Sequence, residues 1–302
     1  MQQSQCTAVH PGLNGPEKEW LIMKIKRRQT IASALLTSLM LSLAAGASAQ
    51  QVTLKAVNAF QEGTTYARNF EAFVKKVNDE GKGLVQINYL GGPKAIPTME
   101  QGAALRNGVV DLSNTTTSFV ASVSPESLSV NYATVPWAEM RRNGTLEFLN
   151  KLMMEKGLYY FARTGDGVPY HIYLNKPISK ADLSGLKIRI APIYREFFTR
   201  LGASVMQVAP GEVFTALERG VVDGYGWPLL GIFDLGWHEK TRYRVDPGFY
   251  NIELGVIFSA KTWNSLSQPQ KDFLNKQGAW LEGLNAQMKD EQAPAEIKRQ
   301  AD

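Results

Sequence analysis

Hydrophobic and polar residues alternate in short stretches of the chain, and between them apolar residues return every three or four positions. Val52–Asn58 alternates like a strand with one covered face, and residues 85–89 do the same. Between these two stretches lies the apolar face of a predicted helix that starts near Glu62: Tyr66, Phe70, Phe73, Val74 and Val77. This strand–helix–strand order predicts an α/β fold with a mostly parallel sheet covered by helices.

The same patterns continue to the end of the chain. We expect further helices over residues 98–107, 142–156, 194–201 and 210–220, and a long helix that begins at residue 267. Strands are expected at residues 109–111, 158–162, 170–174, 205–208 and 249–258, with a loop at 164–167. The chain stops in the polar stretch 296–302 without a helix-capping signal. A truncated C-terminus is therefore expected, with a frayed natural end as the alternative.

One more strand pattern carries a candidate binding residue. Leu186, Ile188 and Ile190 alternate with Lys187 and Arg189, which places Arg189 on the face opposite the aliphatic residues, near the strand's C-terminal end. Ligands of open α/β sheets bind at this edge. A guanidinium there offers a planar fork of donors for a carboxylate. An ordinary surface or lobe-bridging arginine fits the spacing equally well.

An internal repeat indicates two lobes. Ala-Leu-Arg-Asn-Gly-Val-Val-Asp at 104–111 returns as Ala-Leu-Glu-Arg-Gly-Val-Val-Asp at 216–223. Each copy predicts a helix end, a glycine in the left-handed conformation and a short aliphatic strand ending in aspartate. Two lobes of similar construction would face each other across a cleft, where small ligands tend to bind.

Length and charge are consistent with this organisation. A chain of 302 residues is long enough for about two domains. It has 33 basic and 28 acidic residues, of which five basic and two acidic residues lie in residues 1–49. The remaining 28 basic and 26 acidic residues give a net charge of +2, which argues against a nucleic-acid-binding surface.

The N-terminal region has the pattern of an export signal. A basic cluster at 24–28 precedes an apolar stretch at 31–45 and the small residues Ala47-Ser48-Ala49. Met23 is the expected start of translation, and Arg27-Arg28 leaves a twin-arginine route as an alternative. The only cysteine, Cys6, precedes this signal. The exported chain would therefore have no disulfide and no lipid-anchored cysteine.

Catalytic signals are sparse after residue 49. The region has two histidines, His171 and His238, and lacks the common motifs of serine hydrolases, zinc proteases and P-loop nucleotide-binding proteins. Gly224 and Gly226 resemble part of a dinucleotide loop, but the following Trp227 would block the approach of a pyrophosphate. The sequence indicates a binding protein rather than an enzyme.

Three segments together resemble a known family. They are Asp-Leu-Ser-Gly-Leu-Lys-Ile-Arg at 182–189, Gly-Glu-Val-Phe-Thr-Ala-Leu-Glu-Arg-Gly-Val-Val-Asp-Gly at 211–224, and Gly-Gly-Pro at 91–93 with Asn-Gly-Val-Val-Asp at 107–111. From about residue 52 to 288 the chain resembles the solute-binding proteins of tripartite ATP-independent periplasmic (TRAP) transporters, the DctP-type family. The resemblance implies a two-lobed periplasmic-binding-protein-like fold. Residues 1–49 would be an extension and signal peptide, 50–168 with 255–290 lobe I, and 169–254 lobe II, with 291–302 as a candidate for packing on lobe II.

In this family, the arginine of the Lys-Ile-Arg strand pairs with the ligand carboxylate, which implies this role for Arg189. Tyr170, Tyr225 and Trp227 match pocket positions of lobe II. The second arginine of acidic-sugar-binding members is missing from residues 169–173. Gly226 replaces a glutamate that helps to hold a metal ion in 2-oxo-acid-binding members. No cofactor is therefore expected, and a metal ion that bridges the ligand is doubtful.

The resemblance also implies pocket positions outside lobe II. Asn58, Phe60, Thr115 and Thr116 match first-lobe positions, and Trp137 and Glu253 are weaker candidates. For each of these residues, as for Tyr170, Tyr225 and Trp227, a purely structural role is an equal alternative.

These residues predict a periplasmic protein that captures a small monocarboxylate and delivers it to the membrane subunits of a TRAP transporter. A 2-oxo, 2-hydroxy or aromatic acid is the expected ligand, because one arginine faces a wall of tyrosine and tryptophan. The protein itself is expected to be neither membrane-embedded nor bound to nucleic acid. Two alternatives are an exported enzyme that acts on small organic acids and a binding protein of an ATP-driven importer or a sensor.

Overall fold

The structure is a computed structural model and describes residues 50–301. The predicted signal sequence, Met23 and Cys6 lie outside the described residues. Eight strands form one sheet: β1 (Val52–Asn58), β2 (Val85–Tyr89), β3 (Leu112–Thr115), β4 (Leu158–Leu174), β5 (Lys187–Ile190), β6 (Ser204–Gln207), β7 (Gly224–Pro228) and β8 (Tyr243–Ser259).

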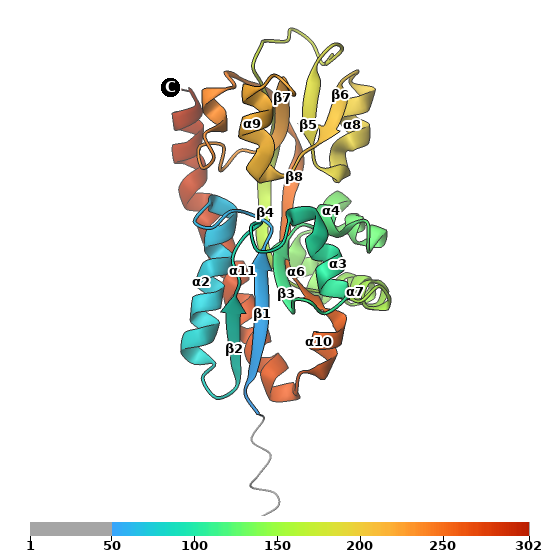
Figure 1. Cartoon of the computed structure of the whole chain (residues 1–302), viewed down its shortest axis with the longest axis vertical. Helices are drawn as coiled ribbons and strands as arrows, with labels where there is room; N and C mark the ends of the chain where they lie inside the picture. Colours follow the sequence, from blue (N-terminus) through green and yellow to red (C-terminus); the bar gives the residue numbers. More distant parts are fainter. Residues whose placement is uncertain (1–49, 302) are drawn as a thin grey trace, which may run out of the picture. The chain divides into compact units, whose positions relative to one another are not determined.

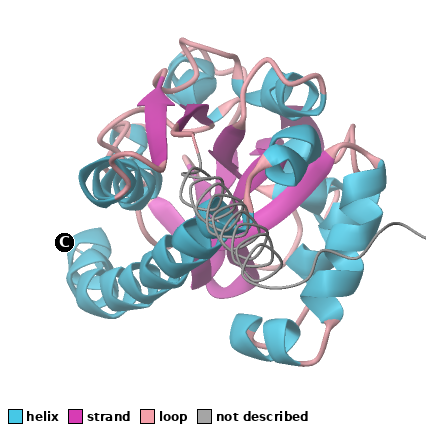
Figure 2. Cartoon of the chain, turned by 90° about the horizontal axis from the view of Figure 1, so that it is seen from below, coloured by secondary structure: helices cyan, strands magenta, loops and turns pink. Residues whose placement is uncertain are grey.

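Helices cover both faces of this sheet (Figure 2). They are α2 (Thr65–Glu80), α3 (Gln101–Arg106), α4 (Thr117–Val120), α5 (Ser129–Tyr132), α6 (Trp137–Arg142), α7 (Thr145–Glu155), α8 (Arg195–Arg200), α9 (Val213–Glu218), α10 (Ala260–Ser265) and α11 (Gln268–Ala301). Among residues 50–301, no helix combines the length and the apolar character that a membrane span requires.

The strand order divides the sheet into two halves. It runs β2-β1-β3-β8-β4-β7-β5-β6. β1 pairs in parallel with β2 and β3 in one half, and β5 pairs in parallel with β6 and β7 in the other, whereas the contacts of β4 and β8 are antiparallel. Each half with its helices forms one lobe, so the predicted two-lobed α/β fold is confirmed.

The strands β4 and β8 belong to both lobes. Each is 17 residues long and runs through the middle of both halves (Figure 1). The sequence pattern predicted two strands separated by a loop at 164–167, and this prediction was wrong. Four irregularities in the register between Tyr160 and Ile172 accommodate the extra residues while β4 remains paired with β8. Such bulges bend a strand and increase its twist, and they lie where β4 passes from its pairing with β8 in lobe I to its pairing with β7 in lobe II.

The two copies of the repeat have the same structural role in the two lobes. In each copy the glycine has a left-handed backbone, with φ of 70° and 65°. The strands β3 and β7 begin one residue after the repeat, rather than within it as predicted. The reason is that each aspartate bonds to the backbone of a neighbouring strand: Asp111 accepts from the amide of Lys55 at 2.7 Å, and Asp223 accepts from that of Lys187 at 2.9 Å.

The long helix α11 contacts both lobes. Leu274 and Leu281 belong to the core of lobe I together with Phe73 of α2. At the other end of α11, the Nε2 atom of Gln300 donates to the carbonyl of Leu229 in lobe II at 2.6 Å. The helix therefore connects the outer surfaces of the two lobes along one side of the sheet (Figure 1).

Candidate ligand-binding site

Arg189 lies on β5 and is only 1% exposed. Its Nε atom donates to the carbonyl of Val208 at 2.8 Å and its Nη1 atom donates to the hydroxyl of Tyr194 at 3.2 Å. Its Nη2 atom is buried and has no partner among the described residues. The protein thus fixes the orientation of the guanidinium and leaves one nitrogen free to bind an additional group.

Charged side chains are almost absent from the interior. Among residues 50–301, only three buried side chains are arginine, lysine, aspartate or glutamate: Arg163, Arg189 and Glu253. Two positive charges and one negative charge leave a net charge of +1 in the interior. Burial of a charge without a counter-charge is costly. Arg163 has the carboxylate of Asp166 at 3.7 Å, whereas Arg189 has no carboxylate within 4 Å among residues 50–301.

The indole of Trp227 lies between Arg189 and lobe I. The Cζ atom of Arg189 is 5.7 Å from the centroid of the Trp227 ring. On its other side, Trp227 makes edge contacts with Phe60 at 6.5 Å and Tyr66 at 5.8 Å between ring centroids. Trp227, a residue of lobe II, therefore meets Phe60 of lobe I across the interface.

Tyr170 approaches Arg189 through Tyr194. The rings of Tyr170 and Tyr194 are 5.8 Å apart, and Tyr250 of β8 lies 5.1 Å from Tyr170. Burial raises the pKa of Tyr170 well above its usual value, Tyr194 adds to this effect and Arg189 opposes it. Burial likewise raises the pKa of Tyr194. Both phenols are therefore neutral at physiological pH.

The lobe I side of the interface carries amide and hydroxyl groups. Asn58 uses its Oδ1 atom to accept from the amide of Phe60 at 3.0 Å and from Asn114 at 3.1 Å. Its Nδ2 atom is buried without a partner among the described residues, and so are Oγ1 of Thr115 and Nε1 of Trp227. Native proteins pair most buried polar groups, so these three open groups are exceptions, and all three lie on predicted pocket residues.

Glu253 organises the loop after β3. Its Oε2 atom accepts from the hydroxyl of Thr116 at 3.0 Å, and from the amide and hydroxyl of Thr117 at 2.9 and 2.7 Å. Its Oε1 atom accepts from the hydroxyl of Tyr160 at 2.6 Å. Because four donors already occupy this carboxylate, its evident role is to position Thr116 and its neighbours.

Two predicted site residues lie away from Arg189's free nitrogen. Tyr225 is stacked on Tyr173 in the core of lobe II, and its hydroxyl pairs with that of Thr241 at 3.1 Å. Trp137 lies at the start of α6, where its Nε1 atom donates to Glu282 at 2.8 Å. Both contacts are of the kind that stabilises a core.

Other residues near the site were missed by sequence reasoning. Tyr194 follows β5 by four residues, at the end of a short 3-10 helix, and binds Arg189. A single tyrosine at the start of a predicted helix gives no signal of a binding role. Tyr250 bonds to Asn131, which in turn bonds to Thr117, and these contacts extend the Glu253 network. Arg163 lies on β4, six residues before the segment 169–173, from which the second arginine of acidic-sugar-binding members is missing.

The surroundings of Gly226 leave little space for a longer side chain. A side chain at this position would meet the ring of Tyr194, because an added Cβ atom would lie 3.1 Å from it. The carbonyl of Gly226 accepts from the hydroxyl of Tyr194 at 3.0 Å and lies 3.5 Å from Nη1 of Arg189. Within residues 50–301, no group of three histidine, cysteine, aspartate or glutamate side chains could hold a metal ion.

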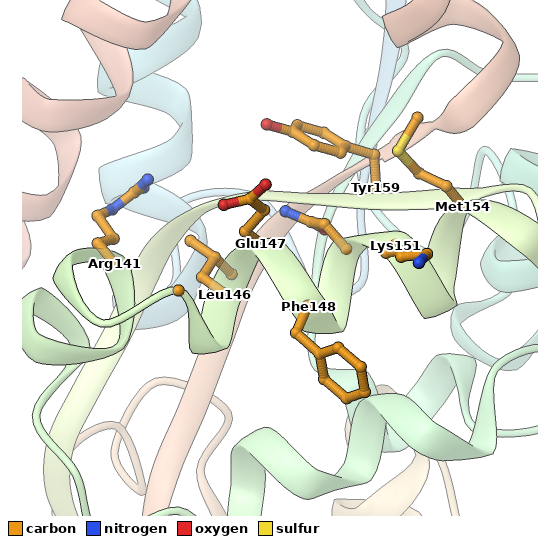
Figure 3. A pocket seen from close by; sticks show the side chains of 9 residues that line it. Arg141, Leu146, Glu147, Phe148, Lys151, Met154 and Tyr159 are labelled. Atoms are coloured by element: carbon orange, nitrogen blue, oxygen red, sulfur yellow. The ribbon is translucent and has the colours of Figure 1, made fainter.

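The lobes are in contact around the site. The cavity between Phe60 and Tyr66 of lobe I and Trp227 and Asp234 of lobe II has a volume of about 10 Å³. A much larger groove of about 710 Å³ lies on the outer side of lobe I, lined by Arg141, Phe148 and Tyr159 among others (Figure 3). None of the predicted site residues lines that groove. A ligand can therefore reach Arg189 only when the lobes separate.

Backbone and side-chain contacts hold the lobes together on two sides. On one side, the peptide of Ile193 in lobe II accepts from the hydroxyl of Tyr132 at 3.1 Å and donates to that of Ser118 at 3.2 Å. On the other side, Asp234 of lobe II accepts from the amide of Thr65 at 2.6 Å. Since Thr64 gives α2 no side-chain cap, Asp234 caps this helix from the opposite lobe.

Replacing Asp234 with alanine is expected to favour the open form. Loss of a helix cap costs about 1 kcal/mol, and here that cost falls only on the closed form, so the ratio of closed to open molecules should decrease about fivefold. Asp234→Asn keeps a capping oxygen and should behave like the wild type. Small-angle scattering would report opening as a larger radius of gyration, and equal radii for the alanine variant and the wild type would contradict the prediction.

Comparison with known families identifies the type of protein. Residues 56–296 match the family model of the bacterial extracellular solute-binding protein, family 7, called DctP. The chain belongs to this family. The match covers both lobes, including the strands β4 and β8 that they share, and most of α11.

Members and structural neighbours of family 7 differ in the ligands that they are named for. A monocarboxylate 2-oxoacid-binding periplasmic protein of Nostoc sp. is 25% identical over 214 residues, which are 67% of this chain and 58% of the relative, so the chain spans less than two thirds of that relative's length. The C4-dicarboxylate-binding protein DctB of Bacillus subtilis is 24% identical over 265 residues, or 82% of this chain and 74% of the relative.

A solved structure confirms the fold. The TRAP transporter solute-binding protein of Bordetella bronchiseptica, crystallised with copurified calcium and picolinate, superposes with a TM-score of 0.74 and 20% identity. The alignment covers 83% of this chain and 78% of that one. At this identity the likeness concerns the fold alone.

Proposed function

We propose that this protein captures a monocarboxylate between its lobes and delivers it to the membrane subunits of a TRAP-type transporter. The observation that carries this proposal is the charge of the interior: Arg163, Arg189 and Glu253 sum to +1, and a single carboxylate completes the balance. The Nη2 atom of Arg189, which is buried and unpaired, is the proposed contact of that carboxylate.

Closure of the lobes is the proposed binding step. In the open form Arg189 and Trp227 are exposed to the solvent, and the acid binds to Arg189 first. Closure brings Phe60 and Asn58 of lobe I against the ligand and removes water, which strengthens the charge-assisted hydrogen bond. The closed form is then the one that the membrane subunits recognise.

The walls of the site favour an acid with an apolar or planar body. Trp227, Phe60 and Tyr170 offer aromatic faces, which pack well on apolar and planar groups. The 2-oxoacids and picolinate named for two of the relatives are acids of this kind. We further propose that binding needs no metal ion, because Arg189 supplies the positive charge close to Gly226.

The place of action is proposed from the N-terminal sequence. Residues 24–49 have the pattern of an export signal, and the family is one of extracellular solute-binding proteins. The protein would therefore meet its ligand in the periplasm, without catalysing a reaction on it.

A thermal-shift screen against organic acids in the presence of EDTA tests this proposal. The purified protein is first unfolded and refolded so that any acid bound during expression is removed. An acid at 100 times its dissociation constant adds about 2.7 kcal/mol to the free energy of unfolding, which corresponds to a rise of several degrees in the midpoint. The expected result is a shift with a few related monocarboxylates. A larger shift with succinate or with sialic acid would contradict it.

A further inference from the structure

We propose that Arg163 is a second ligand-contacting residue, which donates a hydrogen bond to an oxygen of the bound acid outside its carboxylate. This inference rests on the proposed function and narrows it. The ligand would be a monocarboxylate that carries an oxo, hydroxy or lactam oxygen, rather than an unsubstituted acid.

The side chain of Arg163 is buried but has open donors. The residue is 5% exposed, and its Nε atom is fully buried without a partner among the described residues. The one carboxylate of residues 50–301 within 4 Å is that of Asp166, whose Oδ1 atom is 3.7 Å from Nη1, beyond hydrogen-bond distance. Buried donors are normally paired, and an acceptor on the ligand would satisfy this requirement.

Aromatic rings fix the position of the guanidinium. Its Cζ atom lies 4.4 Å from the centroid of the Trp137 ring and 5.9 Å from that of Tyr160. Burial lowers the pKa of Arg163, but Tyr160, Glu253 and Asp166 outweigh this effect and raise it above its usual value. Arg163 is thus held as a permanent cation, and stacking leaves the N–H edge of its guanidinium available.

A row of tyrosines connects Arg163 with Arg189. The ring of Tyr160 beside Arg163 carries a hydroxyl that bonds to Glu253, and Glu253 is linked through Thr117 and Asn131 to the hydroxyl of Tyr250. Tyr250 packs on Tyr170, Tyr170 packs on Tyr194, and Tyr194 bonds to Arg189. The two open guanidinium groups therefore lie on the two sides of one aromatic cluster, at which the lobes meet.

The charge balance determines what Arg163 can bind. Glu253 offsets the charge of Arg163, and only the charge of Arg189 remains for a ligand. A dicarboxylate would leave one buried negative charge uncompensated, which is costly. A neutral oxygen accepts a hydrogen bond from Arg163 without this cost, and a site built to bond such an oxygen rejects the analogue that lacks it.

Two matched pairs of acids test the inference by calorimetry. Pyruvate and propionate differ in one oxo group, and pyroglutamate and cyclopentanecarboxylate differ in the lactam group. The wild type should bind the oxygenated member of at least one pair tenfold or more tightly than its analogue. In Arg163→Lys, which keeps the positive charge beside Glu253 but loses the Nε donor, this preference should fall to threefold or less, while the affinity for the analogue changes by less than threefold.

Arg141 provides a matched control. It also stacks on Trp137, at 5.3 Å, but its side chain is 41% exposed and already pairs with Glu282. Arg141→Met should keep the preference of the wild type. Arg189→Ala should weaken both members of a pair to the same degree, because both carry the carboxylate.

Arg163→Met is the second variant, used if the lysine variant does not fold. It also removes the charge, so both members of a pair should bind more weakly, and the preference for the oxygenated member should still fall to threefold or less. A full tenfold preference in a folded Arg163 variant would overturn the inference, and so would a wild type that binds both members of each pair equally. If neither variant folds, Arg163 is a structural counter-charge and the inference is wrong. If the wild type binds none of the four acids, or Arg189→Ala binds them unchanged, the proposed function itself fails.

Discussion

Replacing Arg189 with alanine is expected to weaken the binding of a monocarboxylate at least tenfold. Loss of one partner from a buried, hydrogen-bonded charge pair costs about 2–5 kcal/mol, and Arg189 is only 1% exposed. Most of the loss should appear as faster dissociation, because the carboxylate would then be buried without a counter-charge. Isothermal titration calorimetry with the acid that gives the largest thermal shift measures the affinity.

Two further variants make the result specific. Arg189→Lys keeps the charge but loses the planar fork of donors, and an intermediate affinity is expected. Arg200→Ala removes an arginine of lobe II whose side chain is 79% exposed and pairs with Glu196, and it should bind like the wild type. An unchanged dissociation constant in a folded Arg189→Ala protein would remove Arg189 from the site.

Replacing Glu253 with glutamine is expected to lower the free energy of unfolding by about 1–3 kcal/mol, because hydrogen bonds to a charged acceptor contribute more than those to a neutral one. The carboxylate accepts four hydrogen bonds, one of them from the amide of Thr117, which cannot reverse its direction. A glutamine could keep its carbonyl oxygen on this amide and turn its NH2 group to the hydroxyl of Tyr160, which can accept while it donates to the carbonyl of Leu254. The bonds would then lose the negative charge of their acceptor, and Arg163 would keep Asp166 as a nearby carboxylate.

Urea unfolding in the absence of ligand measures this effect. Asp79→Asn is a suitable control, because it breaks a surface pair with Lys75 in which both side chains are more than half exposed. Such a pair contributes about 0.2–1 kcal/mol. A Glu253→Gln protein as stable as the control would show that the network around Thr116 and Thr117 does not depend on the negative charge.

The sequence predicted the fold well where a single hydrophobic period runs through a whole strand or a whole helix. Val52–Asn58 and the apolar face from Tyr66 to Val77 are found as β1 and α2. The prediction was wrong at residues 164–167, where Gly165 and Gly167 suggested a loop. Bulges keep β4 continuous there, because its partner β8 supplies hydrogen bonds that no local pattern reveals.

The candidate site was predictable only in part. Three of the predicted site residues come together: Arg189, Trp227 and Phe60. Each lies near or just beyond the end of a strand, at the edge where the lobes meet. Arg163 could not be found in the same way, since a lone arginine in a strand looks like a solvent-exposed residue. Its burial depends on Trp137 and Glu253, which are 26 and 90 positions away and meet it only in the folded chain.

The strands β4 and β8 have a further consequence for how the molecule unfolds. Neither lobe is built from its own strands alone, because each half of the sheet also contains one end of β4 and one end of β8, both 17 residues long. Melting of either end exposes the backbone hydrogen bonds of the other, which couples the two halves into one cooperative unit. A ligand that touches only a few side chains at the interface therefore protects both lobes from unfolding, and its stabilising effect is distributed over the whole of residues 50–301.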